Sequence, residues 1–306
     1  MSHTEVSSSV AGLEIGSRRF LHPGPLRWLR SLGWAMLLFF VFGVVDAVGS
    51  AAPETLFKDN GALVALATLA ICGAGYGLYA GLVRLAEARW PSELVLRPAL
   101  AELAIGLVIG AAMLSAVVGV LVVSGLYEVT GPRASSPWEM ISVGIVSGSM
   151  EELIFRAIVL RLLMRAFGAW PALALSAALF GALHLSNPNA TPTAAIAIAI
   201  EAGLMLAAFY MLTGRIWMSV GVHAAWNFAQ GWIWGARVSG IEVKQSLYLS
   251  QPKAGAPDWL SGGAFGPEAS VPAMVIGTGV AVVVLYWAWK RGNFKAAPDA
   301  PRIEAA

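Results

Sequence analysis

Long apolar runs separated by short polar segments dominate the hydrophobicity pattern of this chain of 306 residues. A helix needs about 20 apolar residues to cross the hydrocarbon core of a bilayer, and most of these runs have that length. The pattern predicts eight spans, at about 32–50, 61–83, 99–126, 138–165, 170–186, 193–212, 216–234 and 271–289. The predicted fold class is therefore all-α, a polytopic membrane protein of about eight transmembrane helices.

These spans and the segments between them divide the chain into six parts. They are an N-terminal tail (1–31), three N-terminal transmembrane helices (32–126), a core of four further spans (138–234), an extramembrane loop (235–270), a last transmembrane helix (271–289) and a C-terminal tail (290–306). The loop is rich in Gly, Pro and Ser, and its length fits a lid or binding loop as well as a passive connection.

Composition supports a membrane protein, because 58% of the residues are hydrophobic and only 12% are charged, against roughly 25% in soluble proteins. Most of the 20 lysine and arginine residues fall in the tails and in alternate loops, which predicts that both termini are cytoplasmic. The single cysteine, Cys72, excludes an internal disulfide and a cysteine-rich metal site. No nucleic-acid-binding signature is found in the sequence.

The span 138–165 contains two adjacent carboxylates and a guanidinium, in the stretch from Ser149 to Arg156. Charges at this depth cost roughly 2.5–3.5 kcal/mol each, so such residues usually have a function or a partner. Glu152 and Arg156 are four residues apart and can form an ion pair that joins helices. Glu151 points about 100° away from Glu152 around a helix. It can therefore be a separate working base, or a further part of a purely structural cluster.

Two of the four histidines lie in other spans, and both should turn from lipid toward a common polar cavity. His223 and Asn227 share one face of their helix, since they are four residues apart. A carboxylate and an imidazole around one water form a general-base unit, and a second imidazole with a carboxamide can stabilise an oxyanion. Glu151, His184 and His223 could instead bind Zn²⁺ with a water in the open position. The sequence leaves the cofactor open between none and Zn²⁺.

Several other residues in the spans receive simpler interpretations. Ser147 and Ser149 are interpreted as small packing residues, and Glu201 as a candidate for a supporting role near the site. Asp46 and Glu102 receive no role. Pairs of glycines at four-residue spacing predict close helix–helix approach, namely Gly77 and Gly81, Gly106 and Gly110, and Gly144 and Gly148.

Three motifs in this order resemble those of the CPBP family, the CAAX-protease and bacteriocin-processing (Abi) intramembrane proteases, which include the type II CAAX prenyl endopeptidases. The motifs are Glu151-Glu152-x-x-x-Arg156, Phe180-x-x-x-His184 and His223-x-x-x-Asn227. The resemblance covers about 138–230, and the segment from Trp259 to Glu268 is similar to a loop of some bacterial members. The resemblance implies that 138–234 is the catalytic core.

The resemblance implies an eight-helix intramembrane protease with a polar active-site cavity. Glu151 would activate water, and His184 would share that water or a metal. His223 and Asn227 would stabilise the oxyanion or complete the metal site. Glu152 and Arg156 would orient the first helix, with Phe180 in a supporting position. The expected partners are membrane lipid and a membrane-associated or lipidated peptide or protein substrate.

Two alternatives belong to other functional classes. A catalytically silent scaffold or immunity factor could use the same fold, and a proton-coupled transporter could use the buried Glu, His and Arg as a relay. No inverted repeat supports the transporter. For straight, upright helices at 1.5 Å per residue, the depths of Glu151, His184 and His223 do not coincide. A separation of Glu151 from His184 by more than about two water-bridged contacts would contradict the catalytic interpretation.

Overall fold

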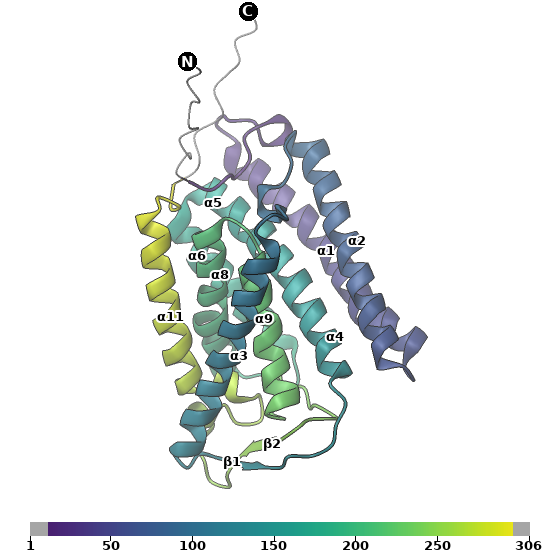
Figure 1. Ribbon diagram of the computed structural model, residues 1–306. Helices are drawn as coiled ribbons and strands as arrows, with labels where there is room; N and C mark the ends of the chain where they lie inside the picture. The colour runs from purple at the N-terminus through teal and green to yellow at the C-terminus, as the bar shows by residue number, and fades with distance from the viewer. Residues whose placement is uncertain (1–11, 296–306) are drawn as a thin grey trace, which may run out of the picture.

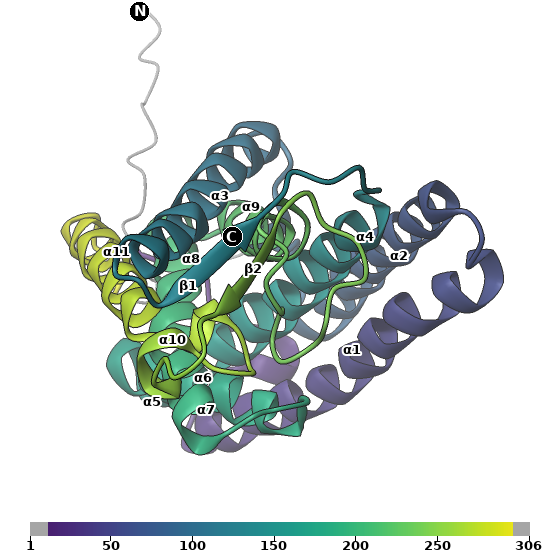
Figure 2. The same cartoon turned by 90° about the horizontal axis from the view of Figure 1, so that it is seen from below.

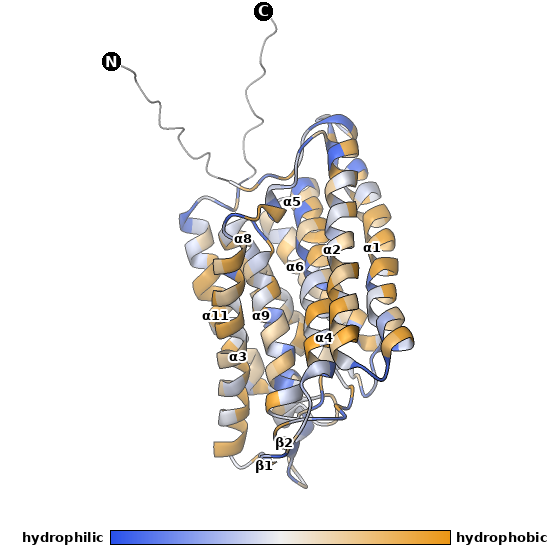
Figure 3. Cartoon of the chain, turned by 45° about the vertical axis from the view of Figure 1, so that its right-hand side comes forward, coloured by the Kyte–Doolittle hydropathy of each residue, from blue (hydrophilic) through white to orange (hydrophobic). Residues whose placement is uncertain are grey.

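The computed structural model describes residues 12–295, which form a bundle of long helices with one short antiparallel ribbon at one end (Figure 1). Six helices are long and apolar enough to cross a membrane: α1 (Arg27–Phe57), α2 (Gly61–Glu87), α3 (Ala99–Val123), α6 with its last turn (Ala169–Ser186), α7 to α8 (Pro192–Thr213) and α11 (Val271–Lys290). Their outer faces are apolar along most of their length (Figure 3). The chain is therefore an integral membrane protein of mostly helical fold.

The two remaining predicted spans are also helical, but they contain the polar residues. The first runs through α4 (Trp138–Val146), η3 (Ser147–Glu151), η4 (Leu153–Leu160) and α5 (Arg161–Phe167), and the second through α9 (Trp217–Phe228) and η7 (Ala229–Ile233). Since neither is among the six helices above, the count of eight transmembrane helices stays a prediction.

Wide π-type turns interrupt these helices where the polar residues lie. Such turns form η3 and η4, η6 (Ala199–Gly203) between α7 (Pro192–Ile198) and α8 (Leu204–Thr213), and η7. The π-type turn is rare in proteins and is frequent at functional sites. It redirects the side chains that follow, so it changes which residues of a span face the interior.

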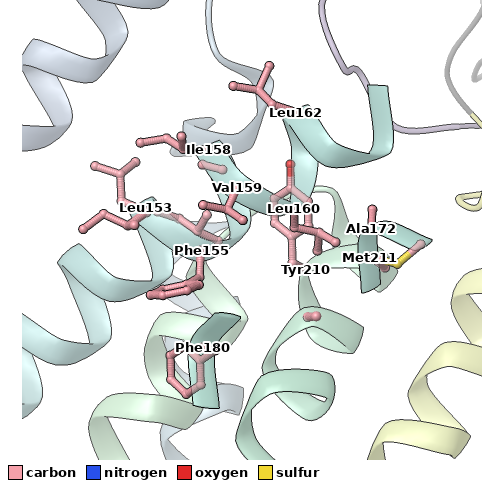
Figure 4. Packing of buried hydrophobic residues seen from close by; sticks show 14 of the residues in the cluster. Leu153, Phe155, Ile158, Val159, Leu160, Leu162, Ala172, Phe180, Tyr210 and Met211 are labelled. Carbon is pink, nitrogen blue, oxygen red and sulfur yellow. The ribbon is translucent and has the colours of Figure 1, made fainter. Parts of the chain in front are cut away.

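The helix that runs from α4 through η3 and η4 to α5, called the central segment below, passes through the middle of the bundle. From Leu153 to Leu162 every residue is buried, and apolar side chains of this segment pack on Phe180 of α6 (Ala169–Leu183) and Tyr210 of α8 (Figure 4). Burial on all sides makes this segment the core of the molecule. The helices around it determine the surroundings of Glu151, Glu152 and Arg156.

Two of the three predicted glycine pairs are close-approach sites. A Cβ atom at Gly110 of α3 would lie 2.1 Å from the carbonyl oxygen of Val222 in α9, and one at Gly148 would lie 2.9 Å from that of Val220. Their pair partners, Gly106 and Gly144, also contact the backbone of α9. The prediction for Gly77 and Gly81 is wrong, since within residues 12–295 a Cβ atom added at either position would have no packing neighbour within 4 Å. No other described helix covers this side of α2.

One end of the bundle contains a buried ion network that the sequence analysis did not predict. Glu87 accepts hydrogen bonds from Arg161 (2.8 and 2.9 Å), Arg89 (2.7 Å) and Trp34 (2.9 Å). Arg89 also forms an ion pair of 2.8 Å with Glu93. The sequence analysis treated these arginines only as charges that flank the spans.

Residues 12–26 of the predicted N-terminal tail pack on this end, where Leu13 and Leu21 are buried. Helix α1 begins at Arg27, five residues before the predicted boundary at 32. Leu13 N–H donates to the carbonyl of Lys295 (3.1 Å), so both ends of the described chain lie at the same end of the bundle. Residues 1–11 and 296–306 of the predicted tails lie outside the described residues.

The opposite end is covered by the long loop 235–270. Strand β2 (Leu249–Pro252) in this loop pairs antiparallel with β1 (Tyr127–Thr130), and Tyr127 is opposite Pro252 (Figure 2). The short helices α10 (Asp258–Ser261) and η8 (Pro267–Ala269) follow. Tyr127 Oη donates to the carbonyl of Ser261 (3.0 Å), which fixes α10 below the bundle. The all-α prediction did not include this small ribbon.

Candidate active site

The two adjacent glutamates of the central segment face different surroundings. Glu152 is fully buried and accepts hydrogen bonds from Arg156 Nε (2.9 Å) and from His223 Nδ1 (2.9 Å). Glu151 is half-buried and lines a cavity of about 260 Å³ with Asp46, His184 and Asn187. The side chains of Glu151 and Glu152 therefore point in different directions, as helix geometry predicts. One carboxylate is occupied by protein partners, and the other borders open space.

His223 is oriented by the occupied carboxylate. Its Nδ1–H donates to Glu152, so Nε2 is the ring nitrogen left for another partner. Arg156 supplies the opposing charge to the same carboxylate and is itself fully buried. The sequence analysis predicted the pair of Glu152 and Arg156 but not that the pair holds His223.

Phe180 separates the charged pair from the second histidine. Its ring lies 5.0 Å from the guanidinium carbon of Arg156, within the range of a cation–π contact, and 4.8 Å from the ring of His184 between centroids. His184 Nδ1–H donates to the carbonyl of Phe180 (2.8 Å). Nε2 of His184 is therefore an acceptor in the neutral ring. Phe180 thus contacts both polar groups, and its supporting position in an active site stays a prediction.

His184 borders two cavities and connects the two halves of the site. One is the 260 Å³ cavity of Glu151, and the other, of about 20 Å³, is lined by His184, His223 and Asn227. The mismatch in depth calculated for straight helices is not present. That calculation took 1.5 Å per residue throughout, whereas the π-type turns of η3 and η4 advance less per residue.

Asn227 is held by a serine on the central segment. Its Nδ2 donates to Ser147 Oγ (2.9 Å), and that hydroxyl donates to the carbonyl of Val143 (2.8 Å). The interpretation of Ser147 as a packing residue therefore misses a polar contact. Asn227 has two hydrogens on Nδ2, so one stays available to a further acceptor.

Three acidic residues near the site had weak signals or none in the sequence. Asp46 lines the cavity of Glu151, and Glu201 and Glu268 line the smaller cavity. The sequence signal for Glu201 was its position within a predicted span. Glu268 ends the segment that resembles a loop of bacterial family members, which was its only signal. Glu102 lies elsewhere and forms an ion pair with Arg215.

The metal hypothesis does not fit the donor groups of the described chain. Among residues 12–295, no three His, Cys, Asp or Glu side chains converge as they would around a metal ion. Glu151 faces one cavity and His223 the other, with Phe180 near both histidines. We therefore derive no step through Zn²⁺.

Comparison with protein families identifies the segment that contains this site. Residues 133–229 match the family model described as "Type II CAAX prenyl endopeptidase Rce1-like". This match confirms the resemblance to the CAAX-protease family over α4 to α9. No curated protein and no solved structure matches the chain.

Proposed function

Because residues 133–229 belong to the Rce1-like family of type II CAAX prenyl endopeptidases, we propose that this membrane protein hydrolyses a peptide bond with water activated by Glu151. The family supports a CAAX-type intramembrane protease, and the residue roles are our proposal. The observation that carries it is the shared cavity of Glu151 and His184, since the carboxylate there has room for water and for a peptide beside it.

In the proposed reaction, the Glu151 carboxylate takes a proton from water while the water oxygen attacks the carbonyl carbon of the substrate. His184, whose Nε2 is an acceptor, holds the second hydrogen of that water. The carbonyl oxygen becomes an oxyanion. The C–N bond then breaks, and Glu151 returns the proton to the leaving amine, so that water is added across the bond.

The oxyanion needs preorganised donors. Asn227 supplies the hydrogen of Nδ2 that Ser147 does not use. His223 donates from Nε2 as an imidazolium, which the carboxylate of Glu152 stabilises at Nδ1. Arg156 and Phe180 keep that carboxylate and both imidazoles in place, so they act as positioning residues.

An apolar face of α1 next to the cavity supports a membrane-associated or lipidated substrate. This face runs along α1 and shares Phe39 and Gly43 with the cavity of Glu151. A hydrocarbon chain on this face would place the attached peptide near the carboxylate. We propose this arrangement for the substrate class and leave the cleavage sequence open.

The test compares wild type with Glu151→Gln, both reconstituted in liposomes. A library of prenylated and unmodified membrane-associated peptides is incubated with each, with and without a chelator, and the products are identified by mass spectrometry. We expect cleavage by wild type alone and no effect of the chelator. Equal results for the two folded proteins would contradict the proposal and favour the silent scaffold. Loss of cleavage with chelator would contradict the metal-free mechanism.

We also propose that the bundle end with Leu13 and Lys295 is cytoplasmic, because the basic residues are concentrated there. The test uses Lys295→Cys and Lys253→Cys in a Cys72→Ser background, since Cys72 is buried and is the only cysteine. A membrane-impermeant maleimide added to intact cells should label the variant at 253 and leave that at 295 unlabelled. Labelling at 295 but not at 253 would show that the topology is the opposite of the proposed one.

A further inference from the structure

The smaller cavity contains two carboxyl groups that the proposed reaction does not use. Glu201 of η6 and Glu268 of η8 line it together with His184, His223 and Asn227. Its volume of about 20 Å³ corresponds to about one water molecule. Two acidic side chains therefore face the imidazoles of His184 and His223 across a space that is too small for a peptide chain.

Glu201 is enclosed without a charge partner. It is 1% exposed, and within residues 12–295 its Oε2 has no hydrogen-bond partner and its carboxyl forms no ion pair. A Cβ atom at Gly277 of α11 would lie 2.9 Å from the Cα of Glu201, so α11 packs tightly against this residue. An ionised carboxylate is strongly disfavoured in such surroundings, whereas the neutral acid is compatible with them.

Glu268 reaches the same cavity from the extramembrane loop. It is 2% exposed, and its Oε1 accepts the backbone N–H of Ser239 (2.5 Å). The loop around it is fixed, since Gly240 N–H donates to the carbonyl of Phe265 (2.7 Å) and Gln230 Nε2 donates to that of Arg237 (2.6 Å). Glu268 therefore has a donor and faces a histidine, both of which favour its ionised form.

We propose that Glu201 and Glu268 share one proton: Glu201 is the neutral acid, and Glu268 is the carboxylate that positions and stabilises His184. Glu201 donates a hydrogen bond to the single water that the cavity accommodates, and that water in turn donates to Glu268. The Glu268 carboxylate stabilises the partial positive charge that His184 gains when it accepts the hydrogen bond of the attacking water. Both are positioning residues, and this role of His184 rests on the proposed function.

This assignment follows from how adjacent carboxyl groups behave in apolar surroundings. Two carboxylates that border one water-sized space cannot both be ionised without a cation, so one of them keeps its proton. Two described arginines could balance this charge, but both have other partners. Arg156 pairs with Glu152, and Arg237 donates to the carbonyl of Ala264. The histidine is the remaining group that can balance the charge of Glu268.

The kinetic test uses substitutions that separate the two roles. Glu201→Gln keeps a neutral donor and should retain kcat within about threefold, whereas Glu201→Leu should lower kcat about tenfold or more at unchanged KM, an effect typical of a supporting group. Glu268→Gln removes the charge that faces His184 and should also lower kcat at least about tenfold. Equal loss for Glu201→Gln and Glu201→Leu would overturn the neutral-acid assignment.

An infrared measurement tests the shared proton without any substrate. The full-length wild type in liposomes should show the carbonyl stretch of a neutral carboxylic acid that shifts in D₂O. This band should disappear in Glu201→Gln and persist at a shifted frequency in Glu268→Gln. The matched control is Glu102→Gln, because Glu102 is also buried in the bundle but forms an ion pair with Arg215. The control should leave the band unchanged.

A band unchanged in Glu201→Gln would overturn the inference even if every variant is active. A wild type that cleaves nothing but shows the predicted band would contradict the proposed function and support the carboxyl pair. The two failures are thus distinguishable. A band lost in Glu268→Gln but kept in Glu201→Gln would exchange the two roles and contradict the assignment of Glu201 as the neutral acid.

Discussion

Glu152 on the central segment accepts the Nδ1–H of His223 at 2.9 Å, which joins two positions 71 residues apart in the chain. This hydrogen bond determines the direction of the imidazole, and Arg156 balances the carboxylate from the other side. Within residues 12–295, the adjacent Glu151 makes no such contact and borders the larger cavity. The two neighbouring glutamates therefore have different surroundings, and we propose orientation of His223 for Glu152 and water activation for Glu151.

Glu152→Gln should destabilise the protein, because Arg156 would remain buried without a charge partner. Breaking one side of a buried ion pair typically costs about 3–5 kcal/mol. The same change at Glu151 should alter the free energy of unfolding by less than about 1 kcal/mol, since that side chain is half-buried and borders a cavity. Both variants should lose peptidase activity. Detergent-titrated unfolding in micelles measures the difference, and equal stability of the two variants would contradict the separation of roles.

Asn227→Leu should lower kcat by about 10²–10³, the usual effect of removing one oxyanion donor. Ser147→Ala should have a smaller effect on kcat, since Ser147 only orients the amide through its hydroxyl. The matched control is Ser142→Ala. Ser142 is equally buried on the same segment, and its hydroxyl likewise donates to a carbonyl four residues earlier. If Ser142→Ala and Ser147→Ala have the same kcat, the contact from Asn227 has no role in the reaction.

Gly110→Ala should disrupt the contact between α3 and α9, the helix that contains His223 and Asn227. The added Cβ would lie 2.1 Å from the carbonyl oxygen of Val222, and backbone on both sides leaves no flexible side chain to move. Overpacking of this kind costs about 1–3 kcal/mol or more. Gly119→Ala in the same helix is the control, because no atom lies within 4 Å of that position. Thermal unfolding should show a lower Tm for the first variant only.

The sequence was sufficient to predict the mostly helical membrane fold and to single out several of the residues that line the two cavities. Apolar runs have a clear length signal, and charged residues within them are rare enough to be noticed, as Glu151, Glu152 and Arg156 were. The pairing of Glu152 with His223 was not predictable, since a spacing within one helix does not indicate which residue of another helix it meets. The π-type turns have no simple sequence signal either, so the depth calculation was wrong.

Other misses have a common physical cause, namely that a residue near a span end can be solvated or buried. Arg89 and Arg161 were only counted among the basic residues that predict the topology, but each belongs to the buried network with Glu87. Glu268 lies in a loop, where a carboxylate is usually solvated, yet its carboxylate lines the smaller cavity. Gly77 and Gly81 have the spacing of a packing pair, but no helix covers them. These outcomes depend on tertiary contacts.

Acid should destabilise the protein through Glu93, which lies between α2 and α3 outside the spans. Burial of this carboxyl opposes its ionisation, but the guanidinium groups of Arg89 and Arg161 and the hydrogen bond from Tyr79 together outweigh that effect and lower the pKa of Glu93 from 4.5 to about 2. A carboxyl whose pKa is lowered by folding stabilises the folded state above its unfolded pKa and loses that contribution as the pH falls. The contribution, on the order of 3 kcal/mol, should therefore be present above about pH 4.5 and decline toward pH 2.

Thermal unfolding of the wild type and Glu93→Gln between these pH values tests this. The wild type should be the more stable protein above pH 4.5, and the difference should shrink as Glu93 becomes protonated, because Gln resembles the neutral acid. Glu128→Gln is the control, since Glu128 is an exposed carboxyl on β1. A constant difference in Tm across this range would mean that the pair of Glu93 with Arg89 does not contribute to the acid sensitivity of the fold.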